Sequence, residues 1–145
     1  MKSDFSLSVQ YASLAQNLPP RHAFRRWIRA AILKKVGITI RIVDEEEGLE
    51  LNRLYRGRDY ATNVLTFVYD EFDPVMGDMV LCAPVIEREA LAQSKSLESH
   101  YAHMSVHGAL HLQGYDHENE SDAATMEALE AKIMARLGYQ NPYGV

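Results

Sequence analysis

Two histidines separated by three residues, His107 and His111, begin the stretch of this sequence best suited to chemistry. Four residues at about 100° each return the second side chain to within about 40° of the first on an α-helix, so both imidazoles share one face. Gly114 offers a place for the chain to leave the helix, which lets a third imidazole, His117, turn back toward the first two. Three converging neutral imidazoles can hold one zinc ion and leave its fourth position for water. Residues 107–117 therefore predict a catalytic metal site.

The spacing of these histidines matches the extended zinc-peptidase pattern His-Glu-x-x-His-x-x-Gly-x-x-His, except at one position. In those peptidases the glutamate beside the first histidine is the general base, and here that position is Gly108. Glycine cannot accept a proton, so either another group moves the proton or the substrate is different. A peptidase or amidohydrolase with an unusual base therefore stays open as an alternative.

Other side chains near the three histidines are candidates for supporting roles. His103 lies one helical turn before His107 and is expected either to orient a ligand, to touch the substrate, or to bond an ordinary carbonyl. Asp116 is the candidate for proton transfer or for orienting His117, although an aspartate at a turn often only accepts a hydrogen bond from a backbone N–H. Cys82 is expected to be a small buried apolar residue rather than a fourth ligand.

Length and composition limit the classes of protein that fit. The chain has 145 residues, of which 47% are hydrophobic and 24% charged, as in an ordinary globular protein of one domain. It has no long apolar run and no charged-then-apolar leader, so neither a membrane partner nor export is expected. The single cysteine excludes an intramolecular disulfide and fits a reducing compartment such as the cytosol.

The net charge of −5 is unevenly distributed along the chain. Residues 1–69 carry 11 basic and 7 acidic side chains, whereas residues 70–145 carry 4 basic and 13 acidic ones. Six of the basic residues lie in residues 21–35, and Arg53, Arg56 and Arg58 form a second cluster. A polyanion could therefore bind one face of an acidic protein, although such arginines also occur on solvated helix faces.

Hydrophobic periodicity predicts four strands. Residues 5–11 and 38–43 alternate apolar and polar side chains, which is typical of half-buried strands. Residues 62–68 and 79–82 are rich in apolar and β-branched side chains. A loop is expected at residues 69–73, followed by a turn from Pro74 to Gly77.

The same pattern predicts five helices. Apolar residues at helical spacing follow Pro20 and favour a first helix that ends near Gly37. An acidic first turn favours a second helix after residue 44, with Leu54 on its inner face. A third helix begins at Pro84, a fourth is capped by Ser99 and contains the histidines, and a fifth spans about residues 121–137.

Three segments together closely resemble the YbeY family of bacterial endoribonucleases that mature ribosomal RNA. They are His-Gly-x-Leu-His-Leu-x-Gly-Tyr-Asp-His at 107–117, Leu-Asn-x-x-Tyr-Arg-x-Arg-Asp-x-x-Thr-Asn-Val-Leu-Thr-Phe at 51–67, and Gly77-Asp78 at the start of a strand. The likeness covers the chain from about residue 38 to Tyr143. It implies a single α+β domain over residues 1–145, with a small mixed sheet and a metal site at the end of a central helix.

The resemblance also implies an activity and its setting. One zinc ion, held by His107, His111 and His117, would support cleavage of single-stranded RNA. The implied roles are processing of the 3′ end of the small-subunit rRNA and ribosome quality control in the cytoplasm. The small ribosomal subunit and assembly factors are then the expected partners, and DNA is not. Arg56 matches the arginine that the family ties to activity.

The chemistry can be argued independently of the resemblance. Zinc lowers the pKa of bound water from above 15 to about 7, so a hydroxide nucleophile exists at cytosolic pH. A guanidinium offers a planar fork for two phosphate oxygens, which is the role expected of Arg56. Arg53 and Arg58 flank it and are candidates for tracking the RNA backbone, or for ion pairs with Glu50 or Asp59.

Three classes of function therefore stay open. The first is a zinc-dependent endoribonuclease, which the resemblance and the arginines favour. The second is the zinc peptidase or amidohydrolase, which Gly108 disfavours. The third is a metal-stabilised factor that binds the assembling ribosome with little catalysis of its own.

Overall fold

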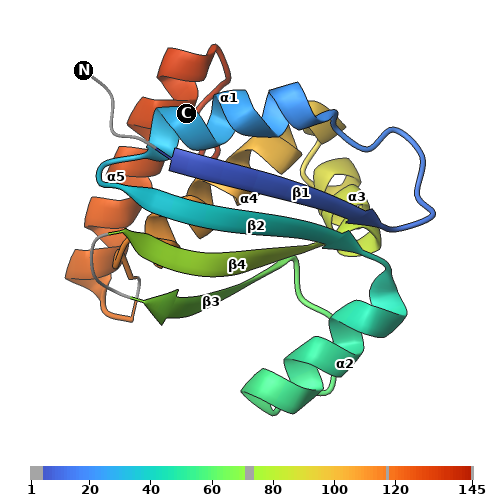
Figure 1. Cartoon of the computed structure of the whole chain (residues 1–145). Helices are drawn as coiled ribbons and strands as arrows, with labels where there is room; N and C mark the ends of the chain where they lie inside the picture. Colours follow the sequence, from blue (N-terminus) through green and yellow to red (C-terminus); the bar gives the residue numbers. More distant parts are fainter. Residues whose placement is uncertain (1–4, 71–73, 117, 145) are drawn as a thin grey trace.

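A computed structural model describes residues 5–70, 74–116 and 118–144 of the chain. Within these residues the chain forms four strands and five helices, and none of the helices is long and apolar enough to span a bilayer (Figure 1). The elements are β1 (Phe5–Ala12), α1 (Arg21–Ala31), β2 (Val36–Val43), α2 (Glu45–Arg56), β3 (Val64–Asp70), β4 (Val75–Cys82), α3 (Ala83–Ala92), α4 (Leu97–Leu112) and α5 (Glu120–Leu137).

The four strands form one mixed sheet in the order β1-β2-β4-β3. β1 and β2 run parallel, as do β2 and β4, whereas β3 is antiparallel to β4 and lies at an edge of the sheet. The segments that join the parallel pairs contain helices, as parallel strands require. The α+β class and the small mixed sheet expected from the sequence are thus confirmed.

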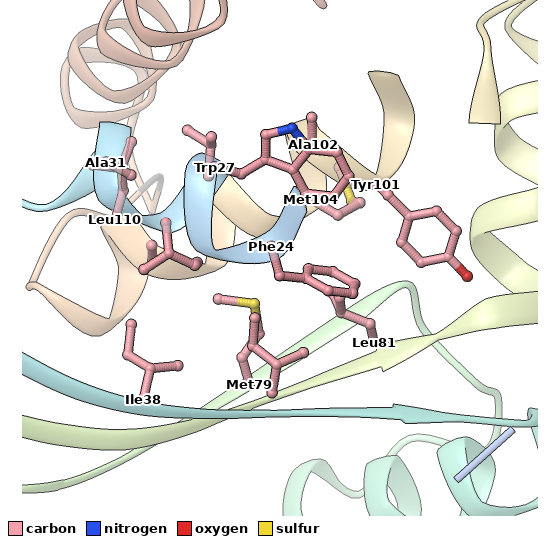
Figure 2. Close-up of a cluster of buried hydrophobic side chains, with 14 of the residues drawn as sticks. Phe24, Trp27, Ala31, Ile38, Met79, Leu81, Tyr101, Ala102, Met104 and Leu110 are labelled. Atoms are coloured by element: carbon pink, nitrogen blue, oxygen red, sulfur yellow. The ribbon is translucent and has the colours of Figure 1, made fainter. Parts of the chain in front are cut away.

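One face of the sheet carries the main hydrophobic core. Side chains of α1 and α4 meet those of β2 and β4 there, and Figure 2 shows Ile38, Met79 and Leu81 of the strands facing Phe24 and its neighbours. Trp27 is 1% exposed and lies edge-on to Phe24, with ring centroids 5.4 Å apart. α4 contacts α1, α3, α5 and two strands, so it is the central helix that was expected to carry the metal site.

A smaller apolar cluster lies among the strand side chains that point the other way. Leu65 and Val80 pack there with Cys82, and α2 contributes Leu51 at its border. Cys82 is 1% exposed, and burial raises the pKa of its thiol. This environment fits the small apolar role expected for Cys82, because a thiolate ligand needs the opposite shift in pKa.

The first helix ends earlier than the sequence pattern indicates. α1 stops at Ala31 rather than near Gly37, and the chain enters β2 at Val36. The reason is the buried side chain of Gln113, whose Nε2 donates to the carbonyl of Ala31 at 2.8 Å. Its Oε1 accepts from the backbone N–H of Leu33 at 2.7 Å, so a residue from the histidine segment ends a distant helix.

Other boundaries also differ from expectation. β4 begins at Val75, so the turn expected at residues 74–77 was wrong, and β3 continues to Asp70 into the expected loop. The helix that carries the histidines is capped by Ser96, whose hydroxyl accepts from the N–H of Ser99, and not by Ser99 itself. Leu54 is 72% exposed rather than inside, because α2 buries Gly48 and Asn52 instead.

Candidate metal centre

Two imidazoles converge at the C-terminal end of α4. The Nε2 atoms of His107 and His111 lie 3.1 Å apart, and the ring centroids are 4.6 Å apart. Both side chains are partly exposed, in contrast to the buried residues around them. The predicted sharing of one helix face by these two histidines is therefore confirmed.

The spacing of the two nitrogens fits a shared metal ion. Two ligands at about 2.05 Å from a tetrahedral zinc are separated by about 3.3 Å, close to the 3.1 Å between the Nε2 atoms. Two nitrogens in one helix at this spacing can bind the same ion without a change of backbone. His117, expected as the third ligand, lies outside the described residues.

Gly108, which stands where the peptidases have glutamate, packs closely against the sheet. A Cβ at this position would lie 2.7 Å from Cε and 2.9 Å from Sδ of Met79, which is fully buried in β4. α4 therefore approaches the sheet too closely for a larger residue unless Met79 moves. A glutamate at this position would require the end of the Met79 side chain to move.

Glu130 of α5 is the centre of the polar contacts behind His107. Its side chain is 0% exposed, and Oε1 accepts from Nε2 of His103 at 2.7 Å and from Nδ1 of His107 at 3.1 Å. The hydroxyl of Tyr143 donates to the same oxygen at 2.8 Å. A carboxylate acceptor places the proton of His107 on Nδ1 and leaves Nε2 unprotonated, which is the tautomer that binds a metal.

The ionisation of Glu130 follows from these contacts. Burial by itself raises the pKa of the carboxyl, but the hydrogen bonds that His103 and His107 donate, together with the charge these imidazoles carry when protonated, outweigh burial and lower the pKa to about 2. For Tyr143, burial and the nearby Glu130 raise the pKa of the hydroxyl. The carboxylate is therefore charged at neutral pH, and the phenol stays protonated and donates.

Acid should weaken the native state through Glu130. Because its native pKa lies below the ordinary 4.5, the carboxylate contributes stability that is fully present above pH 4.5 and is lost as the pH falls toward about 2. For metal-free protein, the free energy of unfolding of the wild type should fall more between about pH 5 and about pH 3 than that of Glu130→Gln, which cannot titrate. Denaturant titrations at each pH measure this difference. Parallel losses in the two proteins would refute the charged state assigned to Glu130.

The other two histidines of α4 are buried in separate contacts. His103 is 6% exposed, and its ring packs between Tyr143 and His107, so its placement favours orientation of a ligand over contact with RNA. His100 is 2% exposed and is bound through Nε2 to Glu89 at 2.8 Å. The histidines of α4 thus fall into two groups: His100 and His103 are buried, whereas His107 and His111 are partly exposed.

A second way to hold a metal is also present in the described part of the chain. His103, His107 and Glu130 offer ligand atoms that all lie within 4.8 Å of one another. The closest of these atoms are already joined by hydrogen bonds around a fully buried carboxylate oxygen. A metal there would have to displace those bonds, whereas the Nε2 atoms of His107 and His111 face the partly exposed side.

An open cleft adjoins His111. It has a volume of about 460 Å³ and is lined by His111, Tyr115 and Asp116 together with Val68 of β3 and Lys34. Asp116, the candidate for proton transfer, is therefore placed in the same cleft as one expected ligand. Tyr115 is partly buried there and offers an aromatic surface.

Arg56 lies at the exposed edge of the sheet. Its Nη2 donates to the carbonyl of Thr66 in β3 at 2.8 Å, and its guanidinium lies over the ring of Phe67, 5.2 Å from the centroid. Tyr55 packs edge-on against the same ring. β3 therefore connects the arginine to the cleft, since Val68 lies two residues beyond Thr66.

The flanking arginines are both exposed. Nε of Arg53 donates to Asp59 at 2.8 Å, which is one of the two ion pairs considered from the sequence. The backbone N–H of Arg58 donates to the backbone carbonyl of Asn52, just after Gly57 caps the end of α2. An exposed ion pair of this kind contributes little stability, so Arg53 can exchange Asp59 for another anion at small cost.

The sequence interpretation missed Glu130 and Tyr143. Glu130 falls four residues after Met126 and three before Ile133, both of which are buried on the inner face of α5. An acidic residue within such an apolar stripe needs buried partners, and this was the available signal. No comparable pattern marks Tyr143.

Comparison with known proteins identifies the family of the chain. The fold and the paired imidazoles define a small α+β protein with a histidine-based candidate metal centre. The model of the family described as Endoribonuclease YbeY matches residues 13–138. The chain belongs to this family.

Individual relatives extend over nearly the whole chain. A Nitrosomonas europaea protein named Endoribonuclease YbeY is 54% identical over 142 residues, which cover 98% of this chain and 87% of the relative. A Nitrosomonas eutropha protein of the same name is 57% identical over 137 residues, which cover 94% of this chain and 97% of the relative. The solution structure of TM1509 from Thermotoga maritima shares the fold, with a TM-score of 0.58, 23% identity and 91% of each chain covered.

Proposed function

We propose that this protein is a zinc-dependent endoribonuclease that cuts single-stranded RNA in the cytoplasm during rRNA maturation. Residues 1–145 act as one catalytic domain, whose substrates are the 3′ end of the small-subunit rRNA and RNA removed in ribosome quality control. Membership of the endoribonuclease YbeY family supports this function. The observation that carries it is the pair of Nε2 atoms 3.1 Å apart, of which the one on His107 belongs to a ring bonded to buried Glu130 and the other to His111, which lines an open cleft.

His107, His111 and His117 are proposed as the metal ligands. Three imidazoles suit zinc, and such a site keeps a position for water. A zinc ion bound there would lower the pKa of that water and polarise a phosphoryl oxygen. Glu130 fixes the ring of His107 by accepting from Nδ1, and a carboxylate in this position also increases the basicity of the ligand.

The remaining chemistry falls to side chains around the cleft. Arg56 is proposed to bind the scissile phosphate, where its planar guanidinium can donate to two oxygens and offset the charge of the transition state. Asp116 is proposed to accept or deliver a proton, because it lies in the cleft beside His111 and Gly108 cannot do so. Arg53 and Arg58 are proposed to contact the RNA backbone on either side of Arg56.

The partners follow from the substrate. A protein of net charge −5 needs a local basic surface to approach RNA, and the arginines at the end of α2 supply one. The small ribosomal subunit and its assembly factors are proposed to present the RNA. The peptidase alternative lacks its base, because Gly108 cannot accept a proton and a glutamate in its place would have to displace the end of the Met79 side chain.

Metal removal should abolish the activity. After dialysis against a strong chelator, cleavage of a single-stranded RNA oligonucleotide should fall about 100-fold or more, because the proposed nucleophile needs the metal. One equivalent of zinc should restore it. Product formation is measured on single-stranded RNA, duplex RNA and casein with the same preparations. Cleavage that persists without metal would overturn the proposal, casein cleavage would favour the peptidase, and RNA binding without cleavage would favour the assembly factor.

A further inference from the structure

The C-terminal segment, residues 138–144, folds back over α4 after α5 ends. Gly138 adopts a left-handed conformation with φ +92°, which turns the chain at the end of α5. The carbonyl of Pro142 then accepts from Nζ of Lys95 at 3.0 Å. Asn141 caps the final turn by accepting from the N–H of Tyr143 at 2.9 Å. These bonds hold the segment in one place.

This arrangement brings Tyr143 to the polar contacts behind the metal centre. Its ring lies edge-on to His103, with centroids 5.3 Å apart, and its hydroxyl donates to Oε1 of Glu130 at 2.8 Å. The side chain comes from outside the regular elements of the fold, yet it reaches the carboxylate that binds His107. Tyr143 is therefore connected to a proposed metal ligand through one intermediate residue.

The hydrogen bonds that orient the Glu130 side chain all end on one carboxylate oxygen. Oε1 accepts from His103, His107 and Tyr143, whereas Oε2 is buried and has no hydrogen-bond partner among the described residues. A carboxylate held through one oxygen can rotate unless its donors fix that oxygen from several directions. Among the described residues three groups donate to Oε1, and Tyr143 is the only one of them that is not an imidazole of α4.

We propose that Tyr143 is a positioning residue for the metal centre. Its hydroxyl holds Oε1 of Glu130 against Nδ1 of His107, so that Nε2 of His107 points to the metal. The inference rests on the proposed function, because it takes His107 as a metal ligand. It assigns to the C-terminal segment a role in retaining the metal.

Zinc retention tests this role directly. Tyr143→Phe keeps the ring against His103 and removes only the hydroxyl. Outer-shell partners of metal ligands typically change metal affinity by 10- to 100-fold, and Tyr143 acts one residue further out, so a loss of about 3- to 10-fold is expected. Tyr139→Phe is the matched control, because Tyr139 lies in the same segment and its hydroxyl bonds Glu98 and Trp27 instead.

The measurements are the apparent zinc dissociation constant and the rate of zinc transfer to a chromophoric chelator. The absorption spectrum of the cobalt-substituted proteins and the thermal midpoint of the metal-free proteins complete the set.

Weaker zinc retention and an altered cobalt spectrum in Tyr143→Phe alone, with unchanged metal-free midpoints, would support the role. Equal retention in Tyr143→Phe and wild type would overturn it and leave the proposed function standing. Equal losses in both variants would also overturn it, because they would show general anchoring of the segment. A wild type that binds no zinc would overturn the proposed metal site itself.

Discussion

Replacement of His111 by alanine should remove the bound metal and RNA cleavage together. The variant loses one of two nitrogens that lie 3.1 Å apart, and a zinc ion left with fewer imidazoles is held far more weakly. We expect less than one tenth of the wild-type zinc content after purification, and cleavage of single-stranded RNA lower by about 100-fold or more. Metal analysis and a cleavage assay on the same preparations measure both quantities.

A second histidine on the surface provides the control for this experiment. His22 is exposed on α1, so His22→Ala removes a histidine side chain that lies away from the proposed metal centre. We expect wild-type zinc content and wild-type cleavage in this variant. If His111→Ala cleaves RNA as fast as His22→Ala, the observed cleavage does not arise from this site, and the proposed nuclease mechanism fails.

Reversal of the charge at Arg56 should have the next largest effect on RNA cleavage. It should act by weakening the contact with RNA and not by removing the metal. The guanidinium lies exposed at the edge of the sheet, and a glutamate there would repel the phosphate that Arg56 is proposed to bind. Loss of one donor to a transition-state charge costs about 100- to 1,000-fold, so kcat/KM for single-stranded RNA should fall by about that factor in Arg56→Glu. Zinc content should be unchanged.

Two further variants separate charge from geometry at this position. Arg56→Lys keeps the positive charge without the planar fork, so it should recover only part of the activity. Arg136→Glu makes the same change of net charge at an exposed position of α5, and this variant should cleave RNA nearly as well as wild type. Comparable losses in Arg56→Glu and Arg136→Glu would mean that only the overall charge matters, which contradicts a specific phosphate contact.

The sequence predicted that histidines of α4 share one face of the helix, but not which residues each histidine contacts. Helical spacing was enough to align His103, His107 and His111, because it depends only on the local period. Their partners come from other helices: Glu89 of α3 binds His100, and Glu130 of α5 binds His103 and His107. Such contacts arise from tertiary packing: the apolar stripe of α5 indicates that Glu130 needs buried partners, but no local pattern identifies them.

The boundaries that were wrong have the same origin. The side chain of Gln113 ends α1 across a sequence separation of 82 residues, and pairing with β2 extends β4 back to Val75. The inner face of α2 was misjudged because two small or polar residues, Gly48 and Asn52, are buried in place of Leu54. Strand and helix types were predictable from periodicity, whereas their ends depended on distant partners.

The position of zinc in crystals of the metal-loaded protein tests the central claim most directly. Anomalous scattering at the zinc absorption edge locates the ion and its ligands independently of activity. The expected result is one zinc at about 2.0–2.1 Å from Nε2 of both His107 and His111, with Glu130 still bonded to Nδ1 of His107. Zinc bound instead by Glu130 and His103, with His111 outside its coordination sphere, would contradict it.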